Sequence, residues 1–322
     1  MSAAQARANP PIGRKRRRGR ARSPTAVRAE MPTRKVAWLG TGIMGSPMAA
    51  NLAAAGFSLS VWNRSSSNLA LPHAASAAHS VADALSGADM VFAMVSDPSA
   101  AQQLALDEGG VATHIRPNQM YVDCSTIDPS TVRTIEHAIT ARGAKYMEAP
   151  VAGSKGPAEQ GALIFMCGGD RSVFDEVQPL LDVMGKKSVF MGEAGNAAKA
   201  KAINNMLMSS MLEAYSEALS LTESSGISME DMRDVIDNGA MACPMYKLKG
   251  ASMQAGEYQT AFPLKHAQKD MRIALGLADE YEQACPVAAA ANQQYIAARR
   301  SGHAEKDFSA VHAQSAPEER RG

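Results

Sequence analysis

The sequence is poor in cysteine and in aromatic residues, and it contains no long apolar run. Aromatic residues make up 5% of the chain, and four cysteines occur among its 322 residues, namely Cys124, Cys167, Cys243 and Cys285. They form no CxxC pair and no cysteine–histidine spacing, which argues against a disulfide framework and against a structural zinc ion. No apolar run approaches the length of a membrane span. We therefore expect no metal, no membrane insertion and a reducing, cytoplasmic location.

A strong net charge is also missing, but the value of +1 hides a basic N-terminal segment. Residues 1–34 contain ten Lys and Arg residues against one acid, Glu30, so the rest of the chain carries an excess of eight negative charges. A mildly acidic body offers no general attraction to nucleic acid, which makes nucleic acid an unlikely partner. The stretch GRKRRRGRARSP cannot build an apolar core, and it predicts a disordered basic extension over residues 1–30.

Three interpretations of this extension are open. It could be a nuclear or nucleic-acid-binding tail, or part of a peptide that directs the protein to the mitochondrion or plastid. It could also be an upstream extension without a role. The last interpretation is favoured because a second methionine, Met31, stands just before the first predicted strand.

From Lys35 onward, short apolar runs alternate with helical patterns, which is typical of a parallel α/β sheet. Strands are predicted in KVAWLG, SLSVWN, MVFAMVS, MYVDCST, KYMEAPVAG, LIFMCGG and SVFMGE. After Gly195 only helical patterns follow, and the first of them is a long helix that ends at Ser225–Gly226. Strands followed by helices alone predict two domains with a boundary near Gly195.

The segment GTGIMG follows the first predicted strand and begins the next helix. Gly40, Gly42 and Gly45 have the G-x-G-x-x-G spacing, in which the first glycine makes the turn, the second lets the backbone approach a pyrophosphate, and the third lets helix and strand pack closely. The amides of the helix start would face the phosphates. We therefore predict that this loop, including Ile43 and Met44, binds a dinucleotide.

The end of the second predicted strand bears on which dinucleotide is bound. An acidic residue usually holds the adenine ribose hydroxyls of NAD there, but this chain has Asn63, followed by Arg64 and Ser65. A carboxylate would repel a ribose phosphate, whereas a guanidinium can bind one through two hydrogen bonds. The residues Asn63, Arg64 and Ser65 therefore favour NADP over NAD.

Five motifs in order resemble those of the β-hydroxyacid dehydrogenase family, which includes 3-hydroxyisobutyrate dehydrogenase and tartronate semialdehyde reductase. They are GTGIMGSPMAANL, VDCSTIDPSTV, EAPVAGSKGPAEQGAL, GNAAKAKAINN and FPLKHAQKDMRIAL, and the resemblance extends from about Met31 to Ala310. The branch they resemble most is that of the glyoxylate/succinic semialdehyde reductases. The resemblance implies an α/β fold in which a doubly wound Rossmann-type domain binds NADP over residues 31–194. It further implies an all-helical domain for substrate binding and dimerisation over residues 195–316, joined by a long interdomain helix.

The resemblance also implies an active site between the domains, a homodimer or homotetramer, and roles for individual residues. Lys201 matches the catalytic lysine, and Asn205 matches the asparagine that accompanies it. Thr126 and Lys269 match cofactor-binding residues. The positions matched to substrate binding are Ser125, Gly153, Ser154, Phe262 and Asp270. One departure is Ala152, where the family commonly has serine, so the loop expected to receive the substrate carboxylate lacks a hydroxyl.

Independently of the family, the reaction of a nicotinamide cofactor needs a proton donor from the protein. Among the seven histidines only His266 stands in a suggestive setting, and Lys201 is the alternative acid. On a helix Lys201 shares a face with Asn205, whereas Lys199 is rotated by about 200° and has Ile203 four residues on. The positive end of the helix dipole would also favour a neutral amine at Lys201. We therefore predict Lys201 as the general acid and Lys199 as a solvent-facing charge.

The predicted reaction is hydride transfer from NADPH to the aldehyde carbon of a short oxo acid such as glyoxylate or succinic semialdehyde. Lys201 would protonate the alkoxide, Asn205 would orient the lysine or the carbonyl, and the amides of Gly153 and Ser154 would hold the carboxylate. One alternative is an NAD-dependent 3-hydroxyisobutyrate dehydrogenase or tartronate semialdehyde (2-hydroxy-3-oxopropionate) reductase. A second alternative is a nuclear protein that keeps the fold while its basic tail binds nucleic acid, which the presence of Lys201 disfavours.

Overall fold

The N-terminal part of the protein is a sheet with a parallel core. The computed structural model describes residues 34–65 and 75–316, so the predicted disordered extension over residues 1–30 lies outside the described residues. Six neighbouring strands lie in the order β3-β2-β1-β4-β5-β6, and all of their pairings are parallel. They are β1 (Lys35–Leu39), β2 (Ser58–Trp62), β3 (Ala75–Ala77), β4 (Met90–Ala93), β5 (Met120–Asp123) and β6 (Lys145–Glu148). This order is that of the doubly wound dinucleotide-binding fold, and it confirms the predicted Rossmann-type domain.

The apolar runs of the sequence form strands because the sheet is buried on both faces. Val36, Ala37, Trp38 and Leu39 of β1 are all buried, although successive side chains point to opposite faces. A strand covered on both sides reads as a continuous apolar run rather than as an alternating one. On one face, the ring of Trp38 stacks on that of Phe92 of β4, with centroids 5.8 Å apart.

The remaining strands extend the sheet with mixed directions. β8 (Leu163–Gly169) is antiparallel to β6 and to β7 (Val151–Ala152), and it is parallel to β9 (Gly185–Phe190). The single strand predicted over KYMEAPVAG is therefore two strands, β6 and β7, which pair with opposite ends of β8. The strand predicted in SVFMGE begins earlier, at Gly185.

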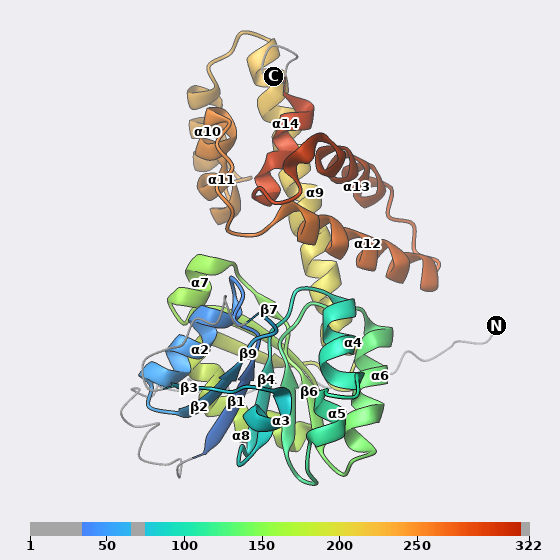
Figure 1. The fold of residues 1–322 in the computed structure, drawn as a ribbon. Helices are drawn as coiled ribbons and strands as arrows, with labels where there is room; N and C mark the ends of the chain where they lie inside the picture. Colours follow the sequence, from blue (N-terminus) through green and yellow to red (C-terminus); the bar gives the residue numbers. More distant parts are fainter. Residues whose placement is uncertain (1–33, 66–74, 317–322) are drawn as a thin grey trace, which may run out of the picture. The chain divides into compact units, whose positions relative to one another are not determined.

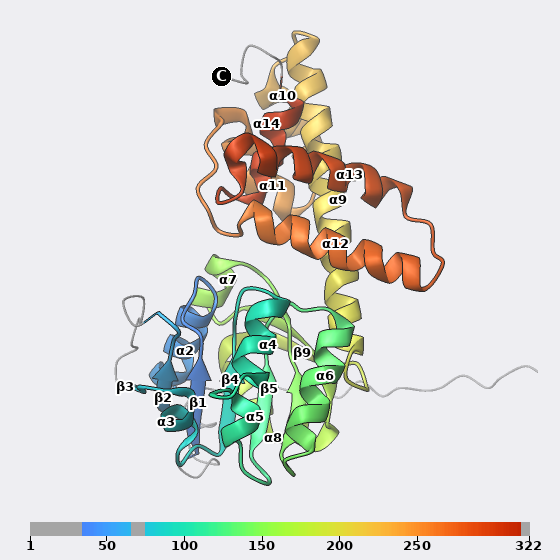
Figure 2. The same cartoon turned by 45° about the vertical axis from the view of Figure 1, so that its right-hand side comes forward.

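Helices cover both faces of this sheet, as Figures 1 and 2 show. One layer contains α3 (Val81–Leu85), α4 (Pro98–Leu106), α5 (Val111–His114) and α6 (Pro129–Thr140). The opposite layer contains α2 (Gly45–Ala54), α7 (Lys155–Glu159) and α8 (Arg171–Met184). Two of these helices have a clear start signal in the sequence: Asp97 and Asp128 cap α4 and α6 through their side chains, and a proline follows each cap.

The C-terminal part is helical, as predicted. Its elements are α9 (Asn196–Ser224), α10 (Met229–Asn238), α11 (Pro244–Ala255), α12 (Leu264–Glu280), α13 (Pro286–Ala298), a π-helical turn (Arg299–His303), a 3₁₀ turn (Phe308–Val311) and α14 (His312–Ser315). Their shared core includes Leu212, Leu219 and Tyr295. Helix α11 was not predicted from the sequence, and its buried residues include the polar Lys249 and the small Gly250. None of the helices in residues 34–65 and 75–316 has the length and apolar character needed to cross a membrane.

The long helix α9 begins against a buried carboxylate of β6. Glu148 accepts backbone N–H bonds from Gly195 (2.6 Å), Ala197 (2.9 Å) and Ala198 (3.0 Å). These are N–H groups of the helix start that have no partner within the helix. Burial raises the pKa of Glu148 to about 7, even though the three N–H bonds favour its ionised form. The start of α9 is therefore fixed to the end of a sheet strand.

We expect Glu148→Gln to destabilise the fold, because an amide presents two N–H donors where three backbone donors converge. The loss in the free energy of unfolding should be on the order of 1–3 kcal/mol, measured by denaturant unfolding at pH 8. Glu159→Gln is the matched control, since it disrupts only an exposed ion pair with Lys155 at 3.8 Å and should change stability little. Equal stability of the two variants would contradict the role given to Glu148.

Candidate active site

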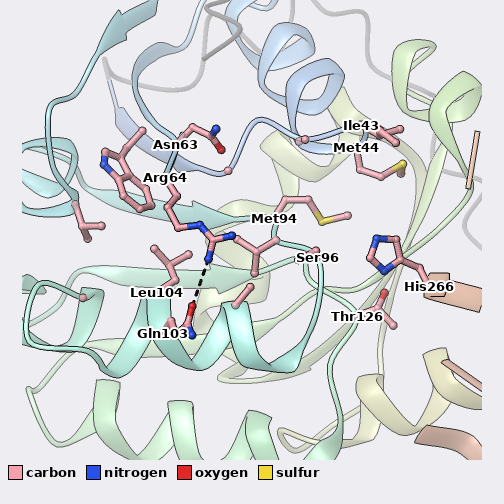
Figure 3. A pocket seen from close by; sticks show the side chains of 18 of the residues that line it. Ile43, Met44, Asn63, Arg64, Met94, Ser96, Gln103, Leu104, Thr126 and His266 are labelled. Carbon is pink, nitrogen blue, oxygen red and sulfur yellow. Dashed lines mark hydrogen bonds between the residues drawn. The ribbon is translucent and has the colours of Figure 1, made fainter. Parts of the chain in front are cut away.

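A cavity of about 790 Å³ lies at the carboxyl ends of β1, β2, β4 and β5. Its wall includes residues of the glycine loop and of the segments that follow the strands, namely Gly40, Gly42, Ile43, Met44, Gly45, Asn63, Arg64, Met94, Ser96 and Thr126. The helical part of the chain contributes Phe262, His266, Lys269 and Asp270. Figure 3 shows Arg64 at one end of this cavity, and Thr126 and His266 at the other. Ligands of doubly wound sheets bind in this crevice, so the cavity lies where the fold predicts a ligand.

The glycine loop has the space that a pyrophosphate requires. A Cβ atom on Gly40 would lie 2.3 Å from the carbonyl oxygen of Met94, and one on Gly45 would lie 2.2 Å from the carbonyl oxygen of Gly40. Gly40 also has a φ of +101°. A Cβ on Gly42, by contrast, would meet nothing within 4 Å. The outer two glycines thus allow close packing, while the middle one leaves open space beside the cavity, so the loop fits a dinucleotide phosphate.

Asn63 and Arg64 have different tasks at the end of β2. The Asn63 side chain accepts the Thr41 amide at 3.1 Å and donates to the Ser65 carbonyl at 2.9 Å, so it ties the glycine loop to β2. Arg64 lines the cavity, and its Nη1 donates to Gln103 Oε1 at 3.3 Å, as Figure 3 shows. Ser65 is not among the described residues that line the cavity.

A chain of polar contacts joins α9 to the cavity wall. Lys201 Nζ donates to Asn205 Oδ1 at 2.8 Å, and Asn205 Nδ2 donates to Asp270 Oδ2 at 2.6 Å. Asp270 Oδ1 lies 3.0 Å from Lys269 Nζ, which donates to the Thr126 carbonyl at 2.5 Å. The structure thus brings together Lys201 and Asn205 with Thr126, Lys269 and Asp270, which are far apart in the sequence.

The amine of Lys201 is buried, with the residue 6% exposed. The pKa of Lys201 is lowered to about 8, and burial is the main cause. The Asp270 carboxylate opposes this shift, and the nearby Lys269 ammonium adds to it. A lysine with such a pKa can both give and take a proton near neutral pH. This is the electrostatic property that a general acid of the site requires.

Lys199 points away from this network. Its ammonium lies 5.4 Å from the centroid of the Tyr281 ring, and the residue is half-buried rather than fully exposed. The predicted solvent-facing charge is therefore partly covered by an aromatic ring, and no polar contact links Lys199 to Asn205 among the described residues.

Several residues predicted for the site do not line the cavity. Lys201, Asn205, Gly153 and Ser154 are absent from the described lining, although Asn205 contacts the lining residue Asp270. The Ser125 hydroxyl accepts the Val95 amide at 3.0 Å, and the residue is buried and absent from the described lining. Contact of Ser125 with substrate stays a prediction. Binding of the substrate carboxylate by Gly153 and Ser154 stays a prediction.

His266, which had a suggestive setting in the sequence but no predicted role, lies in the cavity wall. Burial lowers the pKa of His266, and the charges of Lys269 and Lys265 lower it further, so a neutral imidazole is favoured. Its spacing of three residues from Lys269 on α12 was the available signal. Met94, Ser96 and Gln103 also line the cavity. No sequence motif marked them, because only the fold brings each of them to the cavity. Across residues 34–65 and 75–316, no group of three His, Cys, Asp or Glu side chains could hold a metal ion.

Two family models together match most of the chain. One is described as the NAD binding domain of 6-phosphogluconate dehydrogenase and matches residues 35–192. The other is described as NAD-binding of NADP-dependent 3-hydroxyisobutyrate dehydrogenase and matches residues 195–314.

Individual proteins are similar to this chain over most of its length. Glyoxylate/succinic semialdehyde reductase 1 of Arabidopsis thaliana is 47% identical over 279 residues, which cover 86% of this chain and 96% of that protein. The cytokine-like nuclear factor N-PAC of Homo sapiens is 37% identical over 292 residues, which cover 89% of this chain and 53% of that protein. The structure of Mycobacterium tuberculosis 3-hydroxyisobutyrate dehydrogenase with L-serine has a TM-score of 0.78 at 28% identity, covering 87% of this chain and 98% of that chain.

We expect Lys201→Met to stabilise the protein at pH 7. A lysine pKa lowered from 10.5 to about 8 means that burying the charged amine costs on the order of 3 kcal/mol below pH 8. This cost decreases as pH rises from about 8 to 10.5, because the folded protein then holds Lys201 as a neutral amine. Above about 10.5 the unfolded chain has lost the same proton, and the cost is gone. The Asn205 oxygen keeps a donor in the variant, since Asn204 Nδ2 also reaches it at 3.0 Å.

The measurement is the difference in unfolding free energy between variant and wild type at pH 7 and pH 10.5. The matched control is Lys199→Met, which should show no comparable gain at pH 7. A Lys201→Met variant that is less stable than the wild type at pH 7 would contradict a strained, buried ammonium.

Proposed function

The chain belongs to the 3-hydroxyisobutyrate dehydrogenase-related family of NAD(P)-dependent β-hydroxyacid dehydrogenases, and on this premise we propose that it reduces short aldehyde acids to hydroxy acids with NADPH. The proposed substrates are glyoxylate and succinic semialdehyde, which the name of the Arabidopsis relative supports. The observation that carries the proposal is the contact chain from Lys201 through Asn205 and Asp270 to the cavity wall.

The contact chain fixes which atom of Asn205 faces the lysine. The ionised carboxylate of Asp270 only accepts hydrogen bonds, so it must face the amide nitrogen of Asn205. The amide oxygen is then turned to Lys201 Nζ and accepts one of its protons. At least one further Nζ proton is left to point elsewhere, because an ammonium has three donors and this amide takes one. Asn205 therefore orients the lysine rather than acting as an acid itself.

In the proposed reaction, a bound nicotinamide supplies the hydride. Lys201, mostly protonated at pH 7 with a pKa of about 8, gives its proton to the developing alkoxide. Lys269 holds the Thr126 carbonyl and the Asp270 carboxylate together, so it keeps the α12 side of the cavity against the end of β5. In the direction of oxidation, the neutral amine of Lys201 would take the proton.

The proposed preference for NADPH rests on the residues after β2. Asn63 is engaged with the glycine loop and has no carboxylate to receive ribose hydroxyls. The Arg64 guanidinium lies in the cavity wall, and Gln103 holds it through one nitrogen. The rest of the guanidinium presents donors of the kind that bind a phosphate in a bidentate way.

We expect Lys201→Ala to lower kcat for glyoxylate and succinic semialdehyde by about 10²–10⁴-fold, because it removes the proton donor of the transition state. The affinity for NADPH, measured by fluorescence titration, should be unchanged. Wild-type reductive turnover should fall as pH rises through about 8, where Lys201 loses its proton. Lys199→Ala is the matched control on the same helix and should retain most activity.

Two results would count against this assignment. One is a Lys199→Ala variant that is inactive beside an active Lys201→Ala variant. The other is a wild type that turns over 3-hydroxyisobutyrate with NAD but neither aldehyde with NADPH.

We expect Arg64→Ala to raise KM for NADPH by at least tenfold and to leave KM for NADH within about twofold, since a charge-assisted phosphate contact contributes roughly 1.5–3 kcal/mol. Steady-state kinetics with both cofactors at saturating aldehyde provide the comparison. Gln103→Ala serves as the control, because it removes the partner of Arg64 while leaving the guanidinium in place. If Arg64→Ala raises KM for NADH as much as KM for NADPH, Arg64 contributes to the binding of both cofactors and not to a preference for NADPH.

A further inference from the structure

Phe262 lines the cavity from an irregular segment just before α12. This segment lies beside residues near the C-terminus. Pro263 and Asp307 form an antiparallel bridge, and the Phe308 amide donates to the Phe262 carbonyl at 2.8 Å. The Asp307 amide donates to the Tyr258 carbonyl at 3.2 Å. The backbone around Phe262 is thus held by an isolated bridge and hydrogen bonds to residues 307 and 308 rather than by a helix of its own.

The carboxylate of Asp307 is the centre of this contact. Its Oδ2 accepts the amides of Ala261 (3.1 Å) and Phe262 (3.2 Å). Its Oδ1 accepts the amide (3.1 Å) and the hydroxyl (2.8 Å) of Ser309, and lies 2.8 Å from Lys249 Nζ. Five donors therefore converge on two oxygens, and only an ionised carboxylate can accept from all of them.

The ion pair that supports this carboxylate is buried. Asp307 is 1% exposed and Lys249 is 8% exposed. Burial alone would raise the pKa of Asp307, but the bond and charge of Lys249, with the bonds from Ser309 and Ala261, hold it below its usual value. Lys249 comes from α11, so a third element takes part in this contact through the ion pair.

The side chain of Phe262 has its own contact with the same segment. Its ring meets the Phe308 ring edge-on, with centroids 5.5 Å apart, and the Lys249 ammonium lies 5.1 Å from the centroid of the Phe308 ring. Phe262 is therefore held at its amide, its carbonyl and its ring by residues 307 and 308. No other aromatic ring contact of Phe262 is found in the described part of the chain.

We propose that Asp307 and Phe308 are positioning residues that fix Phe262 in the wall of the aldehyde-acid site, and that the buried ion pair with Lys249 holds the Asp307 carboxylate in place. The inference rests on the proposed function, because it takes Phe262 as a wall of the substrate end. A buried ion pair is weak evidence for stability, since apolar residues often replace such pairs without loss. What an apolar pair could not do is hold two consecutive amides at the cavity edge.

The first test is Asp307→Asn, whose side chain presents an NH₂ group either to Ala261 and Phe262 or to Ser309 and Lys249. We expect kcat/KM for succinic semialdehyde to fall at least tenfold, because a displacement of about 1 Å near a reacting centre can cost 10²-fold. The dissociation constant for NADPH should stay within about twofold, since the glycine loop and Arg64 lie at the other end of the cavity. Lys265→Met is the matched control, because it breaks an exposed ion pair with Glu305 between the same two segments.

A second variant covers the case in which Asp307→Asn does not fold. Phe308→Leu keeps an apolar side chain and the backbone contact to Phe262, and it removes the ring contacts with Phe262 and with the Lys249 ammonium. We expect a rise of about three- to tenfold in KM for succinic semialdehyde, with a smaller change in kcat and no change in NADPH affinity. Unchanged kcat/KM in Phe308→Leu, or loss of NADPH affinity in parallel with activity, would overturn the proposal.

Hydrogen exchange separates this proposal from the proposed function. Peptides covering Ala261 and Phe262 should exchange faster in Asp307→Asn than in wild type or Lys265→Met, while peptides covering the glycine loop should not change. This readout needs no substrate. Faster exchange in an enzyme that reduces no aldehyde would contradict the proposed function alone, whereas unchanged exchange at residues 261–262 would contradict the positioning role.

Discussion

The carboxylate of Glu148 at the start of α9 is the contact on which the candidate site depends. It fixes the first turn of the helix to the sheet strand β6, and Lys201 and Asn205 follow within the next turns of that helix. α12 packs along α9 and brings Lys269 and Asp270 to the same place. A change in the position or the phase of the helix start would displace all four residues together. One buried acid thus connects the sheet that carries the glycine loop with the helix that carries Lys201 and Asn205.

The features that the sequence predicted correctly are those that depend on short-range spacing. The strand, glycine loop and helix around Gly40 to Gly45 follow from local chemistry, and the cavity beside Gly42 is where that spacing requires it. The pairing of Lys201 with Asn205 follows from the four-residue period of a helix. These features need no knowledge of which elements meet in space.

The features that the sequence could not predict arise from contacts between distant segments. Asn205 meets Asp270, and Lys269 meets Thr126, only because α12 packs against α9 and faces the end of β5. The hydroxyl of Ser125 accepts the Val95 amide for the same kind of reason. Asp307 and Phe308 lie outside every motif of the sequence analysis, and their relation to Phe262 is visible only in the folded chain.

The cavity draws its two ends from segments with separate supports. Arg64 follows the end of β2 and contacts Gln103 of α4. Phe262 is held by Asp307 and Phe308, and Asp307 is paired with Lys249 of α11. No described contact joins these two supports directly. Substitutions at such distant positions usually act additively. Given the roles proposed for Arg64 and Phe262, a lineage with this architecture could change its redox cofactor without changing its carbon substrate, and gene duplication could then diversify either trait alone.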